Sequence, residues 1–358
     1  MAKTEKSGGG MARGIAILAG AAAAGVAAGL TAERLVVGRS RLKPDPFANE
    51  PYGKIKGDRE YDIAALDGAR LFVSEIGPAS ATEGAIFLHG YSLDHSIWHH
   101  QMTGLDGRRR HVFYDARHHG RSVGGNPKPK MPVLAADLKT ILDASGLQSC
   151  ILVGHSMGGM AVLEFCRLYH RELHDRVKGL MLVNTTHTDA FKTMVAAELV
   201  GPVERRTRRV IDRFLTDKRS MRMLRLRGDD LSYILVRLFG FGSGASPSQI
   251  EHVRKLLACF PSVELVEMID MFRKWDMGDA LDAIDVPTLI VAGGDDRITS
   301  LKASKHMAEK IPGARFHEFE GVGHTSMLER SVEFNELFRS FTDEVLGTSG
   351  GKRRSVAR

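Results

Sequence analysis

Residues 151–159 read Ile-Leu-Val-Gly-His-Ser-Met-Gly-Gly, which places Ser156 between the glycines at positions 154 and 158. An apolar run precedes this serine, and a helix-forming run over residues 160–169 follows it. On a sharp strand-to-helix turn a serine projects its hydroxyl clear of the backbone, and glycines two residues to either side let strand and helix approach closely. The stretch therefore predicts a nucleophile elbow, with Ser156 as the first candidate for catalysis.

Two loops far downstream offer the partners that such a serine needs. A serine hydroxyl is a poor nucleophile near neutral pH, so it requires a base within hydrogen-bond reach and a carboxylate that orients the base. Residues 286–292 predict a buried strand that ends in a turn with Asp295 and Asp296, and residues 314–319 predict a last strand whose loop carries His324. The serine, an aspartate and the histidine each follow a strand, in the chain order that a serine triad on an open α/β sheet requires.

On these motifs, and on two more, the chain resembles the α/β-hydrolase family. Residues 89–91, His-Gly-Tyr, are similar to the family's oxyanion loop, and residues 115–122, Asp-Ala-Arg-His-His-Gly-Arg-Ser, are similar to its Asp-x-Arg-Gly-His-Gly-x-Ser signature. The second motif departs from the family at His118, where glycine is usual. Because the role of this signature in the family is mainly structural, the departure concerns the turn and not the chemistry.

The resemblance also implies which residues carry the reaction. The stretch from Gly293 to Asp296 matches the family's Gly-x-x-Asp acid loop, so the acid is expected at Asp296 and not at its neighbour Asp295. The backbone N–H of Met157, directly after the nucleophile, is expected to be one oxyanion donor, and by resemblance the N–H of Tyr91 is the other. The triad is then Ser156, Asp296 and His324.

The rest of the chain predicts an α/β fold, with a mostly parallel central sheet flanked by helices. Helices are expected over residues 132–145 and 157–169. An inserted helical cap is expected over roughly residues 187–280, since about a hundred residues are too many for an ordinary connection. Within it helices are expected at 204–217, 220–227, 231–239 and, after a capping box at Ser246, to 258. Strands are expected at 70–76, 85–88, 111–114, 150–153, 178–183, 287–292 and 314–319.

The two ends of the chain are expected to lie outside the domain over residues 45–346. Residues 1–44 form a basic and hydrophobic segment in which residues 14–32 are uncharged, which suits one bilayer crossing. A membrane anchor is the favoured interpretation, and the alternatives are a cleaved secretory signal or a soluble or disordered Ala-rich helix. Membrane association is therefore expected, with secretion or a cytoplasmic location as alternatives. Prolines 44, 46 and 51 and the residues to Asp62 indicate a linker, and residues 347–358 a disordered basic tail.

Charge and composition narrow the partners. Of the net charge of +7, residues 1–43 carry seven basic and two acidic side chains and residues 347–358 carry four basic ones, so the remainder is slightly acidic. Basic runs of the expected cap, such as Arg205 to Arg209, are most simply solvated helix faces, and a nucleic-acid partner is not expected. The histidines 95, 99 and 100 have helical spacing but lack an accompanying metal-ligand motif, so neither a metal nor another cofactor is expected.

Together these features predict a serine hydrolase that cleaves a carboxylic ester through an acyl-enzyme, as a carboxylesterase or lipase does. A lipophilic ester is expected because the cap is rich in apolar residues, although these could equally pack the cap onto the sheet. They are Phe239, Phe241, Leu257, Phe260, Leu265, Met268, Met271, Phe272 and Trp275. A thioesterase, a lactonase, a carbon–carbon bond hydrolase or a haloperoxidase-like perhydrolase is the alternative on this scaffold, and a non-catalytic ligand receptor is the rival outside enzymes.

Overall fold

The structure, a computed structural model, describes residues 37–105, 107–125, 129–190, 229–259, 268 and 270–347. Its strands are β1 (Arg59–Ala64), β2 (Arg70–Ile76), β3 (Glu83–Leu88), β4 (Arg110–Tyr114), β5 (Ser149–His155), β6 (Val177–Val183), β7 (Thr288–Gly293) and β8 (Arg315–Phe319). Its helices are η1 (His95–Trp98), α2 (His99–Gly104), α3 (Met131–Ser145), α4 (Met157–Leu168), α5 (His170–Asp175), α9 (Asp229–Gly240), α10 (Pro247–Cys259), η2 (Gly278–Ala283), α12 (Leu301–Lys310), α13 (Ser326–Glu329) and α14 (Ser331–Leu346).

The strands form one sheet of eight, in the order β1-β2-β4-β3-β5-β6-β7-β8. The pairs β1·β2 and β2·β4 are antiparallel, and all other neighbours are parallel. This arrangement confirms the predicted α/β class with a mostly parallel sheet. Each of the seven expected strands is present, and the expected helices at 132–145 and 157–169 correspond to α3 and α4.

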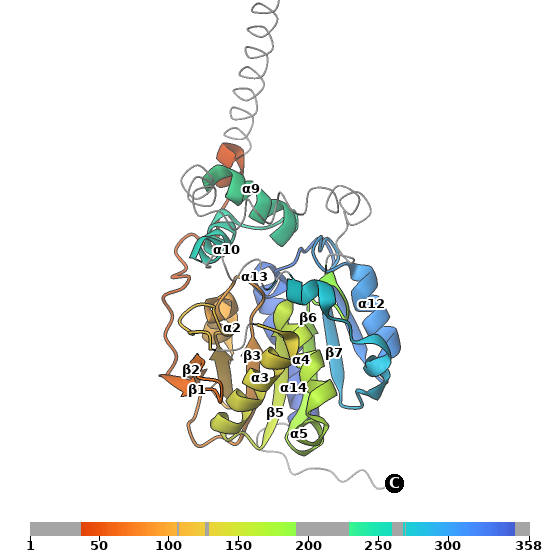
Figure 1. Ribbon diagram of the computed structural model, residues 1–358. Helices are drawn as coiled ribbons and strands as arrows, with labels where there is room; N and C mark the ends of the chain where they lie inside the picture. Colours follow the sequence, from red (N-terminus) through yellow and green to blue (C-terminus); the bar gives the residue numbers. More distant parts are fainter. Residues whose placement is uncertain are drawn as a thin grey trace, which may run out of the picture.

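Two apolar cores explain why the central strands are almost continuously hydrophobic. Successive side chains of a strand point to opposite faces, so Ile86 and Leu88 of β3 join one core with α3 and α4, while Ala85 and Phe87 join the other with α2 and α14. Helices therefore cover both faces of the sheet (Figure 1). A parallel sheet of this kind brings the carboxyl ends of its strands to one edge, where the candidate site lies.

The strand β1 was not predicted from the sequence, because residues up to Asp62 were interpreted as a linker. Only Tyr61 and Ile63 of β1 pack against a core, and both are only partly buried. An edge strand with one neighbour and half-exposed faces carries a weak hydrophobic pattern, which resembles that of a polar loop.

The proline-containing segment before β1 is also not a free linker. The carboxylate of Asp45 accepts hydrogen bonds from the N–H and Oγ of Ser248 at the start of α10, both at 2.8 Å. Glu50 pairs with His99 of α2 at 2.9 Å, and the hydroxyl of Tyr52 lies 3.0 Å from Nε2 of His100. This segment therefore ties α10 to α2, which a count of prolines does not reveal.

The helices α9 and α10 lie within the interval that was expected to form the cap, beyond one end of the sheet (Figure 1). The capping box predicted at the start of α10 is present: the N–H of Ser246 donates to Oε1 of Gln249 at 3.1 Å, and the N–H of Gln249 donates to Oγ of Ser246 at 3.4 Å. The helices expected at 204–217 and 220–227 lie outside the described residues.

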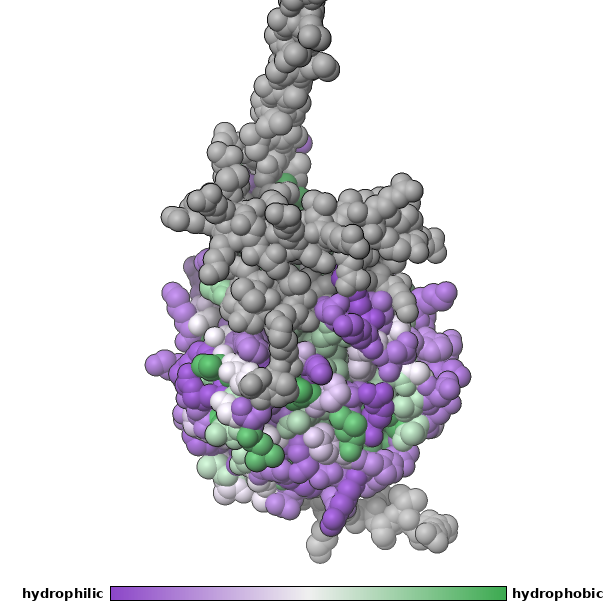
Figure 2. Space-filling model, viewed as in Figure 1, coloured by the Kyte–Doolittle hydropathy of each residue, from purple (hydrophilic) through white to green (hydrophobic). Residues whose placement is uncertain are grey.

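The structure does not test the predictions for the two ends of the chain. Residues 1–36, with the expected anchor at 14–32, and residues 348–358 lie outside the described residues. Among the residues that are described, no helix is both long and apolar enough to cross a bilayer. The described part of the face seen in Figure 2 is mostly hydrophilic, with small, separate apolar areas.

Candidate active site

Ser156 lies on a strained turn between β5 and α4. Its backbone angles are φ 52° and ψ −118°, a left-handed region that non-glycine residues rarely adopt. A Cβ at Gly154 would lie 2.6 Å from the carbonyl carbon of Gly158, and a Cβ at Gly158 would lie 2.5 Å from the carbonyl oxygen of Leu88. Glycine is therefore required on both sides of Ser156, as the sequence predicted, and the turn exposes the serine at the carboxyl edge of the sheet.

His324 and Asp296 form a buried pair at the same edge. Nδ1 of His324 lies 2.8 Å from Oδ2 of Asp296, and both side chains are almost fully buried. Oδ1 of Asp296 also accepts the N–H groups of Ile298 and Thr299, at 2.8 and 2.9 Å, and Oδ2 accepts Oγ1 of Thr299 at 2.7 Å. Burial alone would raise the pKa of Asp296, but His324 and the hydrogen bonds from Thr299 lower it below the usual value. The carboxylate therefore stays ionised and faces the imidazole.

The rival Asp295 has a different environment. Its side chain is exposed, while its backbone N–H donates to the carbonyl of Val322 at 2.8 Å. The carboxylate that contacts His324 is thus that of Asp296, whereas the side chain of Asp295, one residue earlier, points outward.

The loop of His324 contacts the end of β5, beside Ser156, through the side chain of His155. Nε2 of His155 lies 2.8 Å from the carbonyl oxygen of His324, and the two rings are 4.8 Å apart between centroids. Burial, followed by the charge of His324, lowers the pKa of His155 to about 3, so this ring is neutral and donates its Nε2 proton. Within the part of the chain that the structure describes, no hydrogen bond joins the Ser156 hydroxyl to His324. Catalytic hydrogen bonds are often loose before substrate is bound, and they tighten in the complex.

Asn184 is a site residue that the sequence analysis missed. It follows β6, and its Nδ2 donates to Oδ2 of Asp296 at 3.0 Å and to the carbonyl of Gly323 at 3.1 Å. Its Oδ1 accepts Oγ of Ser326 at 2.5 Å. Asn184 therefore holds the acid loop and the histidine loop together. A polar residue directly after the apolar strand Leu180 to Val183 was the signal that could have revealed it.

The expected oxyanion loop lies against the serine. A Cβ at Gly90 would lie 2.8 Å from Nδ1 of His155 and 3.2 Å from Cβ of Ser156. The loop is held by His89, whose Nε2 accepts the N–H of Ala116 at 2.9 Å. Tyr91 follows Gly90 in this loop and Met157 begins α4, so both predicted donors belong to backbone adjoining Ser156. Their action on an oxyanion stays a prediction.

The motif at residues 115–122 has a structural role, as the resemblance implied. The buried Asp115 accepts the N–H groups of His95 and Arg121, at 2.7 and 2.8 Å. Nε and Nη2 of Arg117 donate to the two carboxylate oxygens of Asp137 of α3, at 2.7 and 2.6 Å. His118 has φ 63°, so the position that departs from the family keeps the left-handed conformation that glycine adopts easily.

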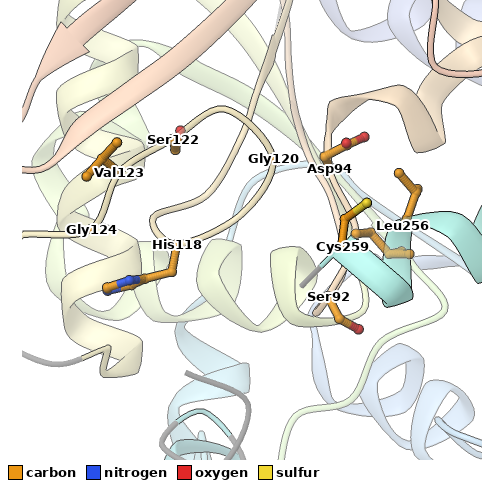
Figure 3. A pocket seen from close by; sticks show the side chains of 10 residues that line it. Ser92, Asp94, His118, Gly120, Ser122, Val123, Gly124, Leu256 and Cys259 are labelled. Atoms are coloured by element: carbon orange, nitrogen blue, oxygen red, sulfur yellow. The ribbon is translucent and has the colours of Figure 1, made fainter. Parts of the chain in front are cut away.

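A cavity of about 270 Å³ borders this motif, lined by Asp94, His118, Gly120 and Cys259 among others (Figure 3). Asp94, His95 and Asp115 each present a ligand atom within 4.8 Å of the others. Nδ1 of His95, however, lies 2.8 Å from Oδ1 of Asp115, and Asp94 accepts the N–H of Ser96 at 2.8 Å. Each of the three side chains therefore already has a hydrogen-bond partner within the fold.

Several buried histidines predict that the fold loses stability in mild acid. Burial, as the first cause in each, lowers the pKa to about 3 in His119 and His155 and to about 4 in His100 and His252. In the unfolded chain these histidines have an ordinary pKa, so as the pH falls they bind protons there before they do so in the fold. The contribution of the neutral rings to folding stability is therefore complete above about pH 6.5 and decreases below it. At pH 5, His119 and His155 should each lower the free energy of unfolding by about 2 kcal/mol relative to neutral pH.

His95 and Glu329, whose pKa values are raised, act in the opposite direction but are outnumbered. We therefore expect the urea midpoint to decrease steadily from pH 7 to pH 5, above the range in which ordinary carboxylates titrate. A midpoint that is constant over this interval would contradict the burial of these rings in neutral form.

The fold and the serine turn define an α/β protein of the hydrolase type, and sequence comparison gives its family. A family model described as alpha/beta hydrolase fold matches residues 86–331, so the chain belongs to the alpha/beta hydrolase fold family. A non-heme chloroperoxidase of Streptomyces lividans is 28% identical over 73% of this chain and 92% of the relative. A 3-oxoadipate enol-lactonase of Acinetobacter baylyi is 24% identical over 79% of this chain and 97% of the relative.

Solved structures show the same fold. An esterase from Exiguobacterium antarcticum has a TM-score of 0.64 and 22% identity, and the match covers 80% of this chain and all of that one. A thermophilic esterase from Thermogutta terrifontis also has a TM-score of 0.64, with 23% identity over 80% of this chain and 99% of that one. At such identities the likeness establishes the architecture and leaves the activity to be argued from the site.

Proposed function

We propose that the protein is a serine hydrolase that cleaves carboxylic esters with the triad Ser156, His324 and Asp296. The observation that carries the proposal is the buried contact of 2.8 Å between His324 and Asp296 at the edge of the sheet where Ser156 turns. His324 takes the proton of Ser156 as the hydroxyl attacks the ester carbonyl, while Asp296 orients the ring and stabilises its charged form. The bond to the alcohol then breaks, and His324 returns the proton to the leaving oxygen.

The backbone N–H groups of Tyr91 and Met157 would stabilise the oxyanion in both steps of this reaction. Water, deprotonated by the same His324, then attacks the acyl-enzyme and releases the acid, which restores the Ser156 hydroxyl. All of these groups belong to the chain itself, so the proposed reaction assigns no step to a metal or an organic cofactor.

The test of the reaction class combines labelling and product analysis. A fluorophosphonate probe should label the protein stoichiometrically, and the same preparation should convert p-nitrophenyl esters to acid and alcohol. Turnover of lactones, or peracid formation, in preference to ester hydrolysis would favour the alternatives represented by the enol-lactonase and chloroperoxidase relatives. Labelling without turnover of any acyl substrate would favour the receptor alternative.

We further propose membrane attachment through residues 14–32, the uncharged segment whose length suits one bilayer crossing.

We also propose that the substrate carries a lipophilic acyl group. Much of the expected apolar cap is core: Met268, Met271 and Trp275 are buried with the sheet residues, which supports the packing interpretation for them. Phe272 is also buried, but its ring meets that of Tyr91 edge-on at 5.2 Å, beside the predicted oxyanion loop. This contact is the support for an apolar wall close to the ester carbonyl.

A series of p-nitrophenyl esters from acetate to dodecanoate tests the acyl group. We expect kcat/KM to be larger for octanoate than for acetate, and the ratio of the two to fall about fivefold in Phe272→Leu, since an apolar contact contributes roughly 1 kcal/mol. The ratio is measured on one preparation, so partial loss of folded protein cancels. A wild-type preference for acetate would confine the apolar residues of the cap to packing.

A further inference from the structure

The loop that carries His324 is in direct backbone contact with the loop that ends α9. A Cβ at Gly242 would lie 2.0 Å from the carbonyl oxygen of Gly321, and a Cβ at Gly323 would lie 2.4 Å from the carbonyl carbon of Phe241. Only a hydrogen atom fits in place of a side chain at both glycines, so the backbones of the two loops touch without intervening side chains. The residue before His324 is therefore part of an interface with the region expected to form the cap.

One carboxylate joins the two loops at this contact. Oε2 of Glu329, in α13, accepts the N–H of Gly242 at 2.8 Å, and Oε1 accepts the N–H of Gly323 at 2.9 Å. A second hydrogen bond joins the same two loops: Oγ1 of Thr325 donates to the carbonyl of Gly240 at 3.0 Å. Hydrogen bonds to an ionised acceptor are stronger than neutral ones, so Glu329 is the stronger of the two connections.

The other side of the Gly323 peptide is held by the acid loop. The carbonyl of Gly323 accepts Nδ2 of Asn184, which also donates to Asp296. The residue before the histidine is thus fixed at its N–H by Glu329 and at its carbonyl by Asn184. Gly323 and His324 are adjacent in the chain. A shift of Gly323 would therefore change the orientation of His324 relative to Asp296.

We propose that Glu329 is a positioning residue for His324, and that it couples the placement of the α9 loop to the alignment of the imidazole. The inference deepens the proposed function and depends on it. Glu329 itself does not touch the reacting atoms: it fixes Gly323, and Gly323 fixes His324. Displacement of the α9 loop would release one of the two N–H groups from the carboxylate and loosen the histidine loop.

The ionisation of Glu329 supplies a readout for this role. Burial, the largest cause, raises the pKa of Glu329 to about 7, although the N–H groups of Gly323 and Gly242 favour its charged form. The charged groups with the largest effect on it are Arg237 of α9 and Arg330, directly after α13, and both favour the carboxylate. A protonated carboxyl presents a hydroxyl donor to one of the two N–H groups, so the connection should weaken as the pH falls through 7.

The experiment compares Glu329→Gln with Glu333→Gln, a matched change at an exposed glutamate of α14. For the full-length wild type and both variants, the rate of fluorophosphonate labelling and kcat/KM for a p-nitrophenyl ester are measured from pH 6 to pH 8.5. At pH 8.5 we expect E329Q to be about tenfold slower than the wild type in both, because a small misplacement of a catalytic group is costly. The difference should shrink toward pH 6, where the wild-type carboxyl is itself protonated, and E333Q should follow the wild type throughout.

A ratio of wild type to E329Q that stays constant with pH, with or without a lower melting temperature, would mean a merely structural role and overturn the inference. If E329Q does not fold, the dependence of the wild-type labelling rate on pH tests the proposal instead. A decrease toward low pH that requires two ionising groups supports the role of Glu329, and a decrease that requires one overturns it. If the wild type is neither labelled nor active, the proposed function fails and the inference with it, whereas an active wild type with a constant ratio removes only the role of Glu329.

Discussion

Replacement of Ser156 by alanine should abolish ester hydrolysis and leave the fold intact. The turn at Ser156 is imposed by the close contacts of Gly154 and Gly158, which the change does not touch. Within the described chain the Ser156 hydroxyl makes no hydrogen bond, so its loss leaves no buried group unpaired. Without a nucleophile no acyl-enzyme forms, and kcat should fall on the order of 10⁴-fold to 10⁶-fold.

The measurement is turnover of a p-nitrophenyl ester by Ser156→Ala, with far-UV circular dichroism and thermal melting to verify folding. Ser80→Ala, a change at an exposed loop serine, is the matched control and should keep full activity. Labelling by a fluorophosphonate should also be lost in S156A alone. Turnover by S156A within a factor of ten of the wild type would refute the assignment of the nucleophile.

The parts of this protein that were predictable from the sequence are those in which geometry restricts the residue type. The elbow is one, since glycines at 154 and 158 are the only residues that its contacts admit. The capping box at Ser246 and Gln249 is another, because a helix start needs side-chain acceptors at set positions. The buried strands were found because both of their faces meet apolar cores, which leaves a continuous hydrophobic run.

The parts that were missed depend on contacts between distant segments. Asn184, Asp296 and Gly323 meet only because β6, β7 and β8 are neighbours in the sheet, and nothing local to Asn184 specifies that order. Glu329 likewise follows the histidine by five residues, but its second partner, Gly242, is in the α9 loop. The hydrogen bond of Asp45 to Ser248 spans most of the chain as well. Local patterns locate the strands and turns, whereas partners of this kind require the assembled topology.

Replacement of Asp296 by asparagine should reduce kcat on the order of 10³-fold to 10⁴-fold, the second largest effect that the site predicts. Oδ1 of Asp296 is held by the N–H groups of Ile298 and Thr299, so the amide oxygen of an asparagine would take that place and its NH₂ would take the place of Oδ2. The NH₂ would then face Nδ1 of His324 and Nδ2 of Asn184. A donor at this position favours the tautomer of His324 that carries its proton on Nε2, and that ring cannot accept the proton of Ser156.

The neighbouring change, Asp295→Asn, removes the same charge one residue away and is the matched control. The side chain of Asp295 is exposed, so we expect kcat within about twofold of the wild type, because surface changes away from a site have small effects. Kinetics and thermal melting of both variants, at one pH above the histidine range, distinguish the loss of the tautomer from a loss of folding. Equal activity of the two variants would contradict Asp296 as the acid, and a larger loss in D295N would move that role to its neighbour. The contact of 2.8 Å between Asp296 and His324 argues that D296N is the slower variant, since among the described residues this is the carboxylate that contacts the imidazole.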